Sequence, residues 1–310
     1  MGTEQMTFGE LGYITTGDTL HEAEPEPVDL RIRQFLQIVS DMTGGSLSNL
    51  RVLDLACLTG YFSVEFAAHG SQVVGIEARE VSVKEARLSK ESLSLNNVEF
   101  FVDDVRNLSK EKYGEFDVVL CPGILYHLYV PDVLNVVQRV AEVCRRFAII
   151  DTIIDTGMYP ARQVPYTWNG NTYWCTEWQE FSPSTSAEEK LKNTWASVDN
   201  EKAVFLTRPS LCNVLRDVGF TSVYECRHPL AAYVYSENRP RIRRDRITLL
   251  AIKGHREKVL LSPGMNAYPE WNLPEKGERG SQSEGQTTKA RLASWIARIL
   301  SLKNVSSRKP

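Results

Sequence analysis

Short apolar runs alternate with amphipathic segments through the middle of the chain. The run at residues 51–55 contains Asp54, and a turn with one glycine, Gly60, follows it. Residues 61–69 have the apolar spacing of a helix, and a second apolar run at 73–76 ends in Glu77. Short apolar runs bounded by turn residues are typical of buried strands. The stretch therefore predicts strand, turn, helix and strand, the first βαβ unit of a doubly wound sheet.

The same alternation continues on both sides of this unit. Further helices are predicted at residues 29–42, 81–95, 131–143 and 208–218. Further strands are predicted at residues 98–102, 116–121, 146–154, 221–226 and 246–252. Strands that alternate with helices indicate a mostly parallel sheet with helices on both faces. We therefore expect an α/β fold.

Three segments lack this alternation. Residues 1–27 have little periodicity and end in Glu-Pro-Glu-Pro, so we expect an N-terminal arm or a lid. Residues 156–203 are rich in aromatic and polar side chains and interrupt the pattern as an insertion. Residues 255–310 have the composition of a flexible tail, with an amphipathic helix predicted at 289–303. The α/β domain is thus expected at residues 28–254.

Composition and charge narrow the classes of protein. The apolar fraction is 42%, the charged fraction is 24% and the net charge is −3, so a nucleic-acid partner is not expected. The six cysteines form no CxxC pair and the five histidines have no ligand spacing, which predicts reduced thiols and no metal. Neither a signal peptide nor an apolar run near 18 residues is present, so we expect a cytoplasmic protein.

Acids at the ends of the predicted strands indicate a ligand. Glu77 follows Asp54 at about the 20-residue spacing at which a βαβ unit places an acid for ribose hydroxyls. Asp103 and Asp104 follow the next predicted strand. The pattern predicts a nucleoside-like ligand.

The stretch VLDLACLTGYFSVEFAAHG resembles motif I of the class I S-adenosylmethionine-dependent methyltransferases, whose usual form is D/E-x-G-x-G-x-G. The similarity continues through Glu77, Asp104 and the stretch 116–127, and covers roughly residues 50–252. It implies a Rossmann-like, seven-stranded sheet of order 3-2-1-4-5-7-6 with strand seven antiparallel, and S-adenosyl-L-methionine as cofactor. Within it, Glu77 would accept from the ribose, Asp104 from the adenine amino group, and Val105 would contact the ring. The cofactor-binding residues implied in this way are Asp54, Ala56, Gly60, Tyr61, Glu77, Ala78, Asp104, Val105, Cys121 and Gly123.

The motif departs from the family pattern at two positions. Ala56 and Leu58 stand where the family has glycine, and only Gly60 remains. Glycine is used where the backbone needs a positive φ or approaches a ligand closely. Leu58 is therefore expected to crowd the cofactor, and weak binding, an altered cofactor pose and lost activity are the alternatives.

A second stretch, residues 122–128 followed by Pro131, is similar to the GVLYH…P segment of the enzymes that carboxymethylate the tRNA wobble uridine. This resemblance carries no substrate over. In this stretch His127 is the candidate general base and Tyr126 a candidate substrate contact. The alternative for both is a buried side chain without a catalytic role.

The insertion is the candidate acceptor site, because segments after strand five lie beside the carboxyl ends of the strands. The predicted substrate-binding residues are Tyr159, Trp168, Tyr173, Trp174 and Trp178. The alternative is that these aromatic residues only pack the insertion. The arginines at 239–246 predict either a phosphate or carboxylate site or a solvated hairpin tip. The helix predicted at 289–303 could contact a membrane or a partner protein, and the alternatives are a packed C-terminal helix and an unstructured tail.

The resemblance, together with these observations, predicts a methyltransferase that acts on an O or N atom of a small-molecule acceptor, with a sugar or glycolipid-type intermediate as the candidate. One alternative is a tRNA-modifying methyl- or carboxymethyltransferase. The other alternative is a non-catalytic binding subunit with the same fold. Leu58 is the feature that supports it, because it stands where the family has glycine.

Overall fold

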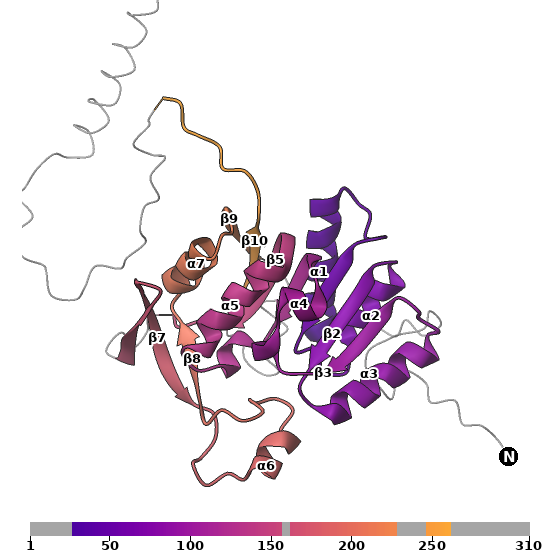
Figure 1. Cartoon of the computed structure of the whole chain (residues 1–310), viewed down its shortest axis with the longest axis horizontal. Helices are drawn as coiled ribbons and strands as arrows, with labels where there is room; N and C mark the ends of the chain where they lie inside the picture. Colours follow the sequence, from indigo (N-terminus) through magenta and orange to yellow (C-terminus); the bar gives the residue numbers. More distant parts are fainter. Residues whose placement is uncertain (1–26, 157–161, 228–245, 262–310) are drawn as a thin grey trace, which may run out of the picture. The chain divides into compact units, whose positions relative to one another are not determined.

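The computed structural model describes residues 27–156, 162–227 and 246–261 (Figure 1). The chain divides into two compact units, Met1–Trp271 and Asn272–Pro310, and the described residues all lie in the first. Some predicted features lie outside the described residues. They are the N-terminal arm, Tyr159, the arginines at 239–244 and the helix at 289–303.

A seven-stranded sheet forms the centre of the described domain. Its strands are β1 (Arg51–Leu55), β2 (Gln72–Glu77), β3 (Val98–Val102), β4 (Phe116–Pro122), β5 (Cys144–Ile153), β9 (Ser222–Cys226) and β10 (Arg246–Ile252). They lie in the order β3-β2-β1-β4-β5-β10-β9, and β10 is antiparallel to both of its neighbours. The predicted fold class and strand order are confirmed.

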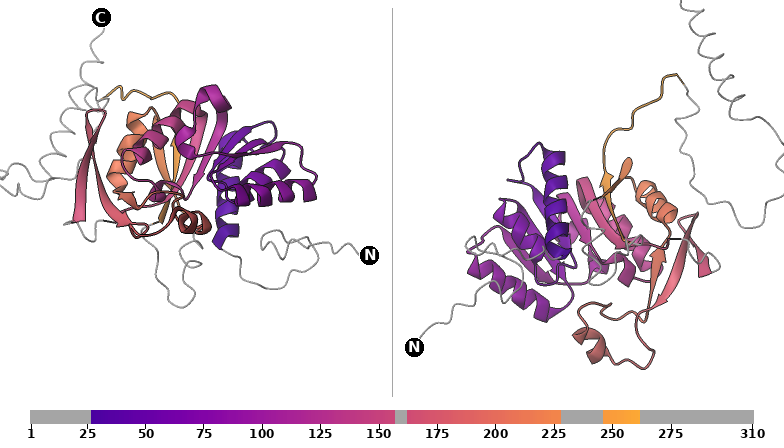
Figure 2. Two further views of the ribbon diagram at one scale, coloured as in Figure 1. Left: turned by 60° about the horizontal axis from the view of Figure 1, so that its bottom comes forward. Right: turned by 180° about the vertical axis from the view of Figure 1, so that it is seen from behind.

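Helices cover both faces of this sheet (Figure 2). The helices are α1 (Pro27–Thr43), α2 (Tyr61–Ala68), α3 (Glu80–Ser92), α4 (Lys110–Tyr113), α5 (Asp132–Val143) and α7 (Arg208–Asp217), with short 3₁₀ turns η1 (Val105–Asn107) and η2 (Leu125–His127). One apolar core joins α1, α2 and α3 to the sheet through buried residues such as Phe35, Phe66 and Val83. A second core joins α5 and α7 to the opposite face through residues such as Leu134 and Leu215.

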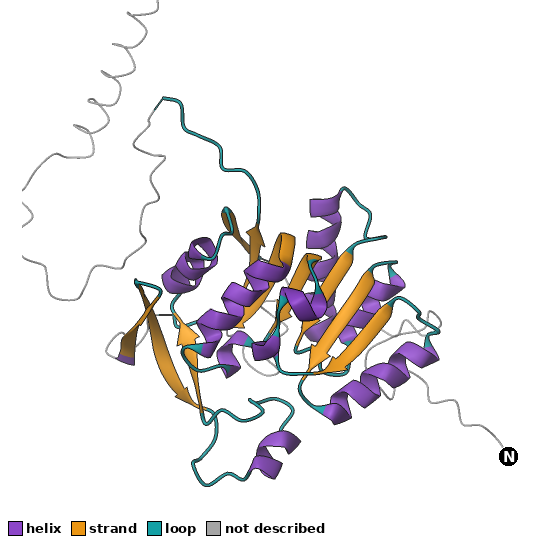
Figure 3. Cartoon of the chain, in the orientation of Figure 1, coloured by secondary structure: helices purple, strands orange, loops and turns teal. Residues whose placement is uncertain are grey.

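The insertion forms a second, smaller sheet that the sequence pattern did not predict (Figure 3). Its strands are β6 (Gln163–Trp168), β7 (Asn171–Gln179) and β8 (Lys202–Leu206), paired antiparallel in the order β6-β7-β8, and α6 (Ala187–Lys192) lies between β7 and β8. Val204 and Leu206 belong to the core under α5 and α7. The N–H of Val204 also donates to the carbonyl of Leu128, 3.0 Å away. The small sheet is therefore packed onto the main one.

Candidate cofactor and active site

A cavity of about 450 Å³ lies at the carboxyl ends of β1, β2 and β4. A smaller cavity of about 50 Å³ adjoins it toward β3, and both are lined by Ala56, Glu77, Arg79, Ile124 and Ala196. Of the residues predicted to bind the cofactor, the larger cavity contains Ala56, Tyr61, Glu77 and Gly123. The smaller one adds Ala78, Asp104 and Val105. Seven of the ten predicted cofactor residues are thus brought together at this edge of the sheet.

The turn after β1 has a left-handed backbone although two of its family glycines are replaced. The φ angles are 54° at Ala56, 47° at Leu58 and 85° at Gly60. Positive φ is uncommon for residues other than glycine. Two hydrogen bonds hold the turn to β2, from the Cys57 N–H to the Ile76 carbonyl (3.1 Å) and from the Leu58 N–H to Glu77 Oε2 (3.2 Å). The Leu58 side chain lines the larger cavity.

Glu77 presents a buried carboxylate where the two cavities meet. The residue is only 2% exposed, and its Oε1 accepts from the backbone N–H of Arg79 at 2.8 Å. Its Oε2 accepts from Leu58 as described above. Backbone donors on both oxygens fix the direction of the carboxylate.

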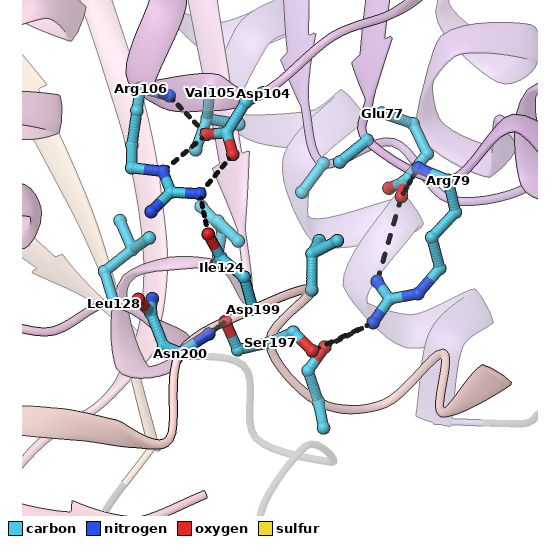
Figure 4. Close-up of a pocket in the computed structure, with 14 residues that line it drawn as sticks. Glu77, Arg79, Asp104, Val105, Arg106, Ile124, Leu128, Ser197, Asp199 and Asn200 are labelled. Carbon is cyan, nitrogen blue, oxygen red and sulfur yellow. Dashed lines mark hydrogen bonds and ion pairs between the residues drawn. The ribbon is translucent and has the colours of Figure 1, made fainter. Parts of the chain in front are cut away.

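Asp104 lies on the far side of the smaller cavity and is bound by Arg106 (Figure 4). Asp104 Oδ1 accepts from the backbone N–H and Nε of Arg106 at 2.8 and 3.0 Å, and Oδ2 lies 2.6 Å from Nη2. The same Nη2 is 2.6 Å from Asp199 Oδ2, in the segment before β8. The hydrogen bonds that Arg106 donates to the Asp104 carboxylate raise the pKa of Arg106 above its usual range, so its guanidinium stays charged.

Three predicted cofactor residues line neither cavity. Asp54 is buried beneath the turn, where its Oδ2 accepts from the N–H and hydroxyl of Ser63 at 3.1 and 2.6 Å and fixes the start of α2. Gly60 precedes α2, and a Cβ there would meet the Phe100 ring at 2.9 Å. Cys121 is fully buried in β4. These positions shape the turn and the core, and the predicted contact of the three residues with the cofactor stays a prediction.

Tyr126 and His127 stand side by side on η2, and both line the larger cavity. Their ring centroids are 4.3 Å apart. His127 Nδ1 lies 2.5 Å from Glu180 Oε1, which also accepts from the Ser197 N–H at 2.8 Å. With Nδ1–H donated to the carboxylate, Nε2 is the acceptor nitrogen of the neutral ring. Nothing in the sequence around Glu180 distinguished it as the partner of His127.

The predicted substrate-binding aromatics of the insertion lie away from both cavities. Trp168 Nε1 donates to Asn135 at 3.0 Å, and Tyr173, which is 1% exposed, donates its hydroxyl to Asp217 at 2.7 Å. The backbone N–H of Trp174 donates to Ser210, and Trp178 stacks on Phe205. These four residues line neither cavity, and their predicted role in substrate binding stays a prediction. The insertion residues that do line the larger cavity are Thr194, Trp195 and Ala196.

Arg79 holds this part of the insertion against the cavity. It is buried beside Glu77, with Nη1 3.9 Å from Glu77 Oε1. Its guanidinium donates to five backbone carbonyls of one segment, those of Lys190, Leu191, Asn193, Ala196 and Ser197. Figure 4 shows Arg79 and Arg106 reaching the same segment from two sides of the smaller cavity. The carboxylates of Glu77 and Asp104 are therefore each linked by an arginine to residues 190–199.

Within the described ranges, no three His, Cys, Asp or Glu side chains gather at distances suited to one metal ion. Among the described helices, none is both long and apolar enough to span a bilayer.

Comparisons with known proteins agree with this geometry. A sequence model of the methyltransferase-domain family matches residues 46–204, more than half of the chain. The ubiquinone biosynthesis O-methyltransferases of Bordetella pertussis and Acinetobacter baylyi are 40% identical over 103 residues and 32% identical over 98 residues. These matches cover 33% and 32% of this chain, and span only 42% and 40% of the length of those relatives.

Among solved structures, the N-terminal domain of EvdMO1 is similar over 82% of this chain and 100% of its own. Its crystal structure in the presence of SAH and D-fucose is 20% identical with a TM-score of 0.53, and the one with SAH bound is 19% identical with a TM-score of 0.54. At this level of identity the likeness concerns the fold.

The sheet order and the acids at its strand ends define a class I S-adenosylmethionine-dependent methyltransferase. The chain belongs to the methyltransferase-domain family. None of these matches tests the resemblance of residues 122–128 to the tRNA-modifying enzymes, which stays a prediction.

Proposed function

We propose that the chain transfers a methyl group to an oxygen atom of a small-molecule acceptor bound in the larger cavity. The observation that carries this proposal is the His127–Glu180 pair, because His127 lines the cavity that Glu77 also lines. A base of this kind serves a hydroxyl group, which must lose its proton as it attacks, more than an amine that is already nucleophilic. The names of the two curated relatives reported above, both O-methyltransferases, support oxygen over nitrogen.

The residues present fit S-adenosylmethionine. Glu77 has a fixed, buried carboxylate for the ribose hydroxyls, and Asp104 with Val105 lines the smaller cavity for the adenine. The turn at Ala56 and Leu58 would hold the methionine part. The volume of the larger cavity, about 450 Å³, lies within the range of ordinary small-molecule sites. When bound, the cofactor supplies a methyl group on a positively charged sulfur.

The chain's own residues contribute orientation and proton transfer. His127 Nε2 takes the proton of the acceptor hydroxyl, and Glu180 stabilises the resulting imidazolium while keeping the ring in position. Asn200 donates its Nδ2–H to the carbonyl of His127 at 3.1 Å, which fixes the backbone of the base. Holding acceptor and methyl donor in one cavity supplies much of the remaining acceleration.

A sugar or glycolipid-type intermediate is the acceptor class that we would test first. The domain of EvdMO1 was crystallised in the presence of D-fucose, and its fold covers 82% of this chain. That likeness supports monosaccharides as first candidates.

Calorimetric titration with S-adenosylhomocysteine tests the cofactor site. We expect micromolar binding to the wild type and a loss of about tenfold or more in Glu77→Gln, because an amide is a weaker acceptor than a carboxylate. The control is Glu85→Gln, which removes an exposed carboxylate from the same cavity and should change the affinity little. No binding at millimolar ligand would contradict the proposal.

Transfer of a labelled methyl group to a panel of monosaccharides tests the base. His127→Gln should lower the turnover rate about 100-fold while leaving S-adenosylhomocysteine affinity unchanged, because the base acts only in the chemical step. His69→Gln, at an exposed histidine after α2, is the matched control. An unchanged rate in His127→Gln would show that His127 is not the base.

A further inference from the structure

One tryptophan of the insertion lies open to solvent at the mouth of the larger cavity. Trp195 lines this cavity although the residue is 76% exposed. Trp178, the other strongly exposed tryptophan among the described residues, stacks on Phe205 and lines neither cavity. An indole that is open to solvent at a cavity wall offers a large apolar contact surface to a ligand. Trp195 is therefore the tryptophan of the described insertion that a ligand in this cavity can reach.

The backbone that carries Trp195 is fixed on both sides of the residue. Arg79 Nη2 donates to the carbonyl of Asn193 at 2.7 Å and to the carbonyl of Ala196 at 2.8 Å. The N–H of Trp195 donates to Asn193 Oδ1 at 3.1 Å. The attachment point of the indole is thus held in place while the ring itself stays open. A ligand that stacks on the ring therefore meets a backbone that is already ordered, which lowers the entropic cost of binding.

The exposed apolar surface continues onto α3. Arg79 immediately precedes this helix, so its hydrogen bonds join the segment of Trp195 to the start of α3. The residues of α3 that line the cavity are Val81, Ser82 and Glu85, which lie on one face of the helix because they are spaced three and four positions apart. Val81 is 56% exposed. Two separate parts of the chain thus present exposed apolar side chains, Val81 and Trp195, on the wall of one cavity.

The segment that carries Trp195 also holds the partner of the proposed base. The N–H of Ser197 donates to Glu180 Oε1 at 2.8 Å, and the same oxygen lies 2.5 Å from His127 Nδ1. Trp195 lines the larger cavity, as His127 does, but it does not line the smaller cavity that contains Asp104. The indole therefore lies at the cavity that contains the base, and not at the one proposed for the adenine.

We propose that Trp195 is a stacking platform for a ring of the acceptor at the mouth of the larger cavity. The inference rests on the proposed methyl transfer, and it names the class of acceptor: a hydroxylated molecule that also carries an uncharged ring with an apolar face. The C–H groups of such a ring are attracted to the electron-rich face of the indole, and the contact removes apolar surface from water. Trp195 selects the acceptor by its ring, while His127 acts on its hydroxyl.

The first experiment compares methyl β-D-fucopyranoside with phenyl β-D-fucopyranoside, which differ only in the group that carries the second ring. Each is titrated into protein saturated with S-adenosylhomocysteine. We expect the phenyl glycoside to bind at least about tenfold more tightly, because its ring stacks on the indole. Trp195→Ala should remove this preference, and Trp195→Phe should retain part of it because an aromatic ring remains. Trp178→Ala is the matched control, since it removes an exposed tryptophan away from both cavities and should keep the full preference.

Three results would overturn the platform: equal affinities for the two glycosides in the wild type, no binding by either, or a preference that persists in Trp195→Ala. Titration of Trp195→Ala with S-adenosylhomocysteine separates the acceptor from the cofactor, and we expect an affinity within about twofold of the wild type. A loss of about tenfold would assign the indole to the cofactor and overturn the acceptor platform. Wild-type protein that binds S-adenosylhomocysteine without preferring the phenyl glycoside refutes only the platform, whereas failure to bind S-adenosylhomocysteine refutes the function beneath it.

Discussion

At the scale of single residues, the turn after β1 keeps its shape without the usual glycines. Ala56 and Leu58 both have positive φ, a conformation that costs an L-residue roughly 1–2 kcal/mol. The N–H of Leu58 reaches Glu77 in this conformation, and the N–H of Cys57 reaches the carbonyl of Ile76. The surrounding contacts therefore maintain a backbone that the side chains alone disfavour.

Leu58→Gly tests whether Leu58 obstructs cofactor binding or is accommodated in the turn without loss of affinity. Because the left-handed backbone is already present, glycine should change the affinity for S-adenosylhomocysteine by less than about threefold, or ~0.6 kcal/mol. Calorimetric titration of variant and wild type measures the difference. A gain of two orders of magnitude would instead mean that Leu58 obstructs the cofactor, and would favour a non-catalytic role.

Asp54 makes the stability of the protein fall as pH rises, which is the reverse of the usual effect of a carboxylate. Burial raises its pKa from 3.8 to about 7, although hydrogen bonds from Ser63 oppose the shift. Between these two values the folded chain binds a proton that the unfolded chain has lost, so the contribution of Asp54 to stability falls as pH rises from about 4 to about 7. Asp54→Asn cannot ionise, and its free energy of unfolding should therefore improve relative to the wild type across this window. Denaturant unfolding at several pH values measures this, and parallel curves would contradict the raised pKa.

At the scale of elements, the part of the insertion between β7 and β8 is the part that contacts the proposed cofactor site. Arg79 holds its carbonyls, Arg106 holds Asp199, and Glu180 accepts from the Ser197 N–H. Arg79 follows β2 and Arg106 follows β3, so residues after two strands of the main sheet hold the segment, and Glu180 adds a contact within it. Its residues 194–196 then form a wall of the larger cavity.

Arg79→Met should release this segment. The variant loses the hydrogen bonds to five carbonyls, so amide exchange at residues 190–197 should accelerate and S-adenosylhomocysteine affinity should fall about tenfold. Arg87→Met is the control, because Arg87 donates to a single carbonyl, that of Phe100, away from the segment. Unchanged exchange in Arg79→Met would show that Arg79 does not hold the segment.

At the scale of the described domain, the two sheets share one core. Tyr173, Cys175, Val204 and Leu206 of the small sheet belong to the same buried cluster as α5 and α7. The two sheets should therefore unfold together, in a single transition reported by any probe.

Tyr173→Ala tests this cooperation. Removing a fully buried aromatic ring and its bond to Asp217 should lower the free energy of unfolding of the whole domain by about 3 kcal/mol or more. Trp178→Ala is the control: the side chain is 54% exposed, so the loss should stay below about 1 kcal/mol. Separate transitions for the two sheets in Tyr173→Ala would contradict a shared core.

Local sequence patterns were sufficient to predict the main sheet and the acids that follow its strands. The period of apolar residues predicted the seven strands of the main sheet, and acids at strand ends predicted Glu77 and Asp104. The small sheet was missed because its aromatic residues are mixed with polar ones, although Asn169-Gly170 between β6 and β7 is a strong hairpin signal. The aromatic residues of the insertion were expected at the acceptor site. Tyr173 is instead buried in the core with α5 and α7, Trp178 is 54% exposed, and Trp195 lines the larger cavity.

The sequence by itself determined the class of fold, the strand order through its family resemblance, and the residues at the ends of β2 and β3. These follow from local periodicity and from turns, which depend on residues close in the chain. Only the tertiary structure decided which distant groups meet: His127 with Glu180, Arg79 with residues 190–197, and Arg31 with Arg246 across Asp151. Such pairs are separated by 50 or more residues and leave no periodic trace, because their distance is set by how the layers pack.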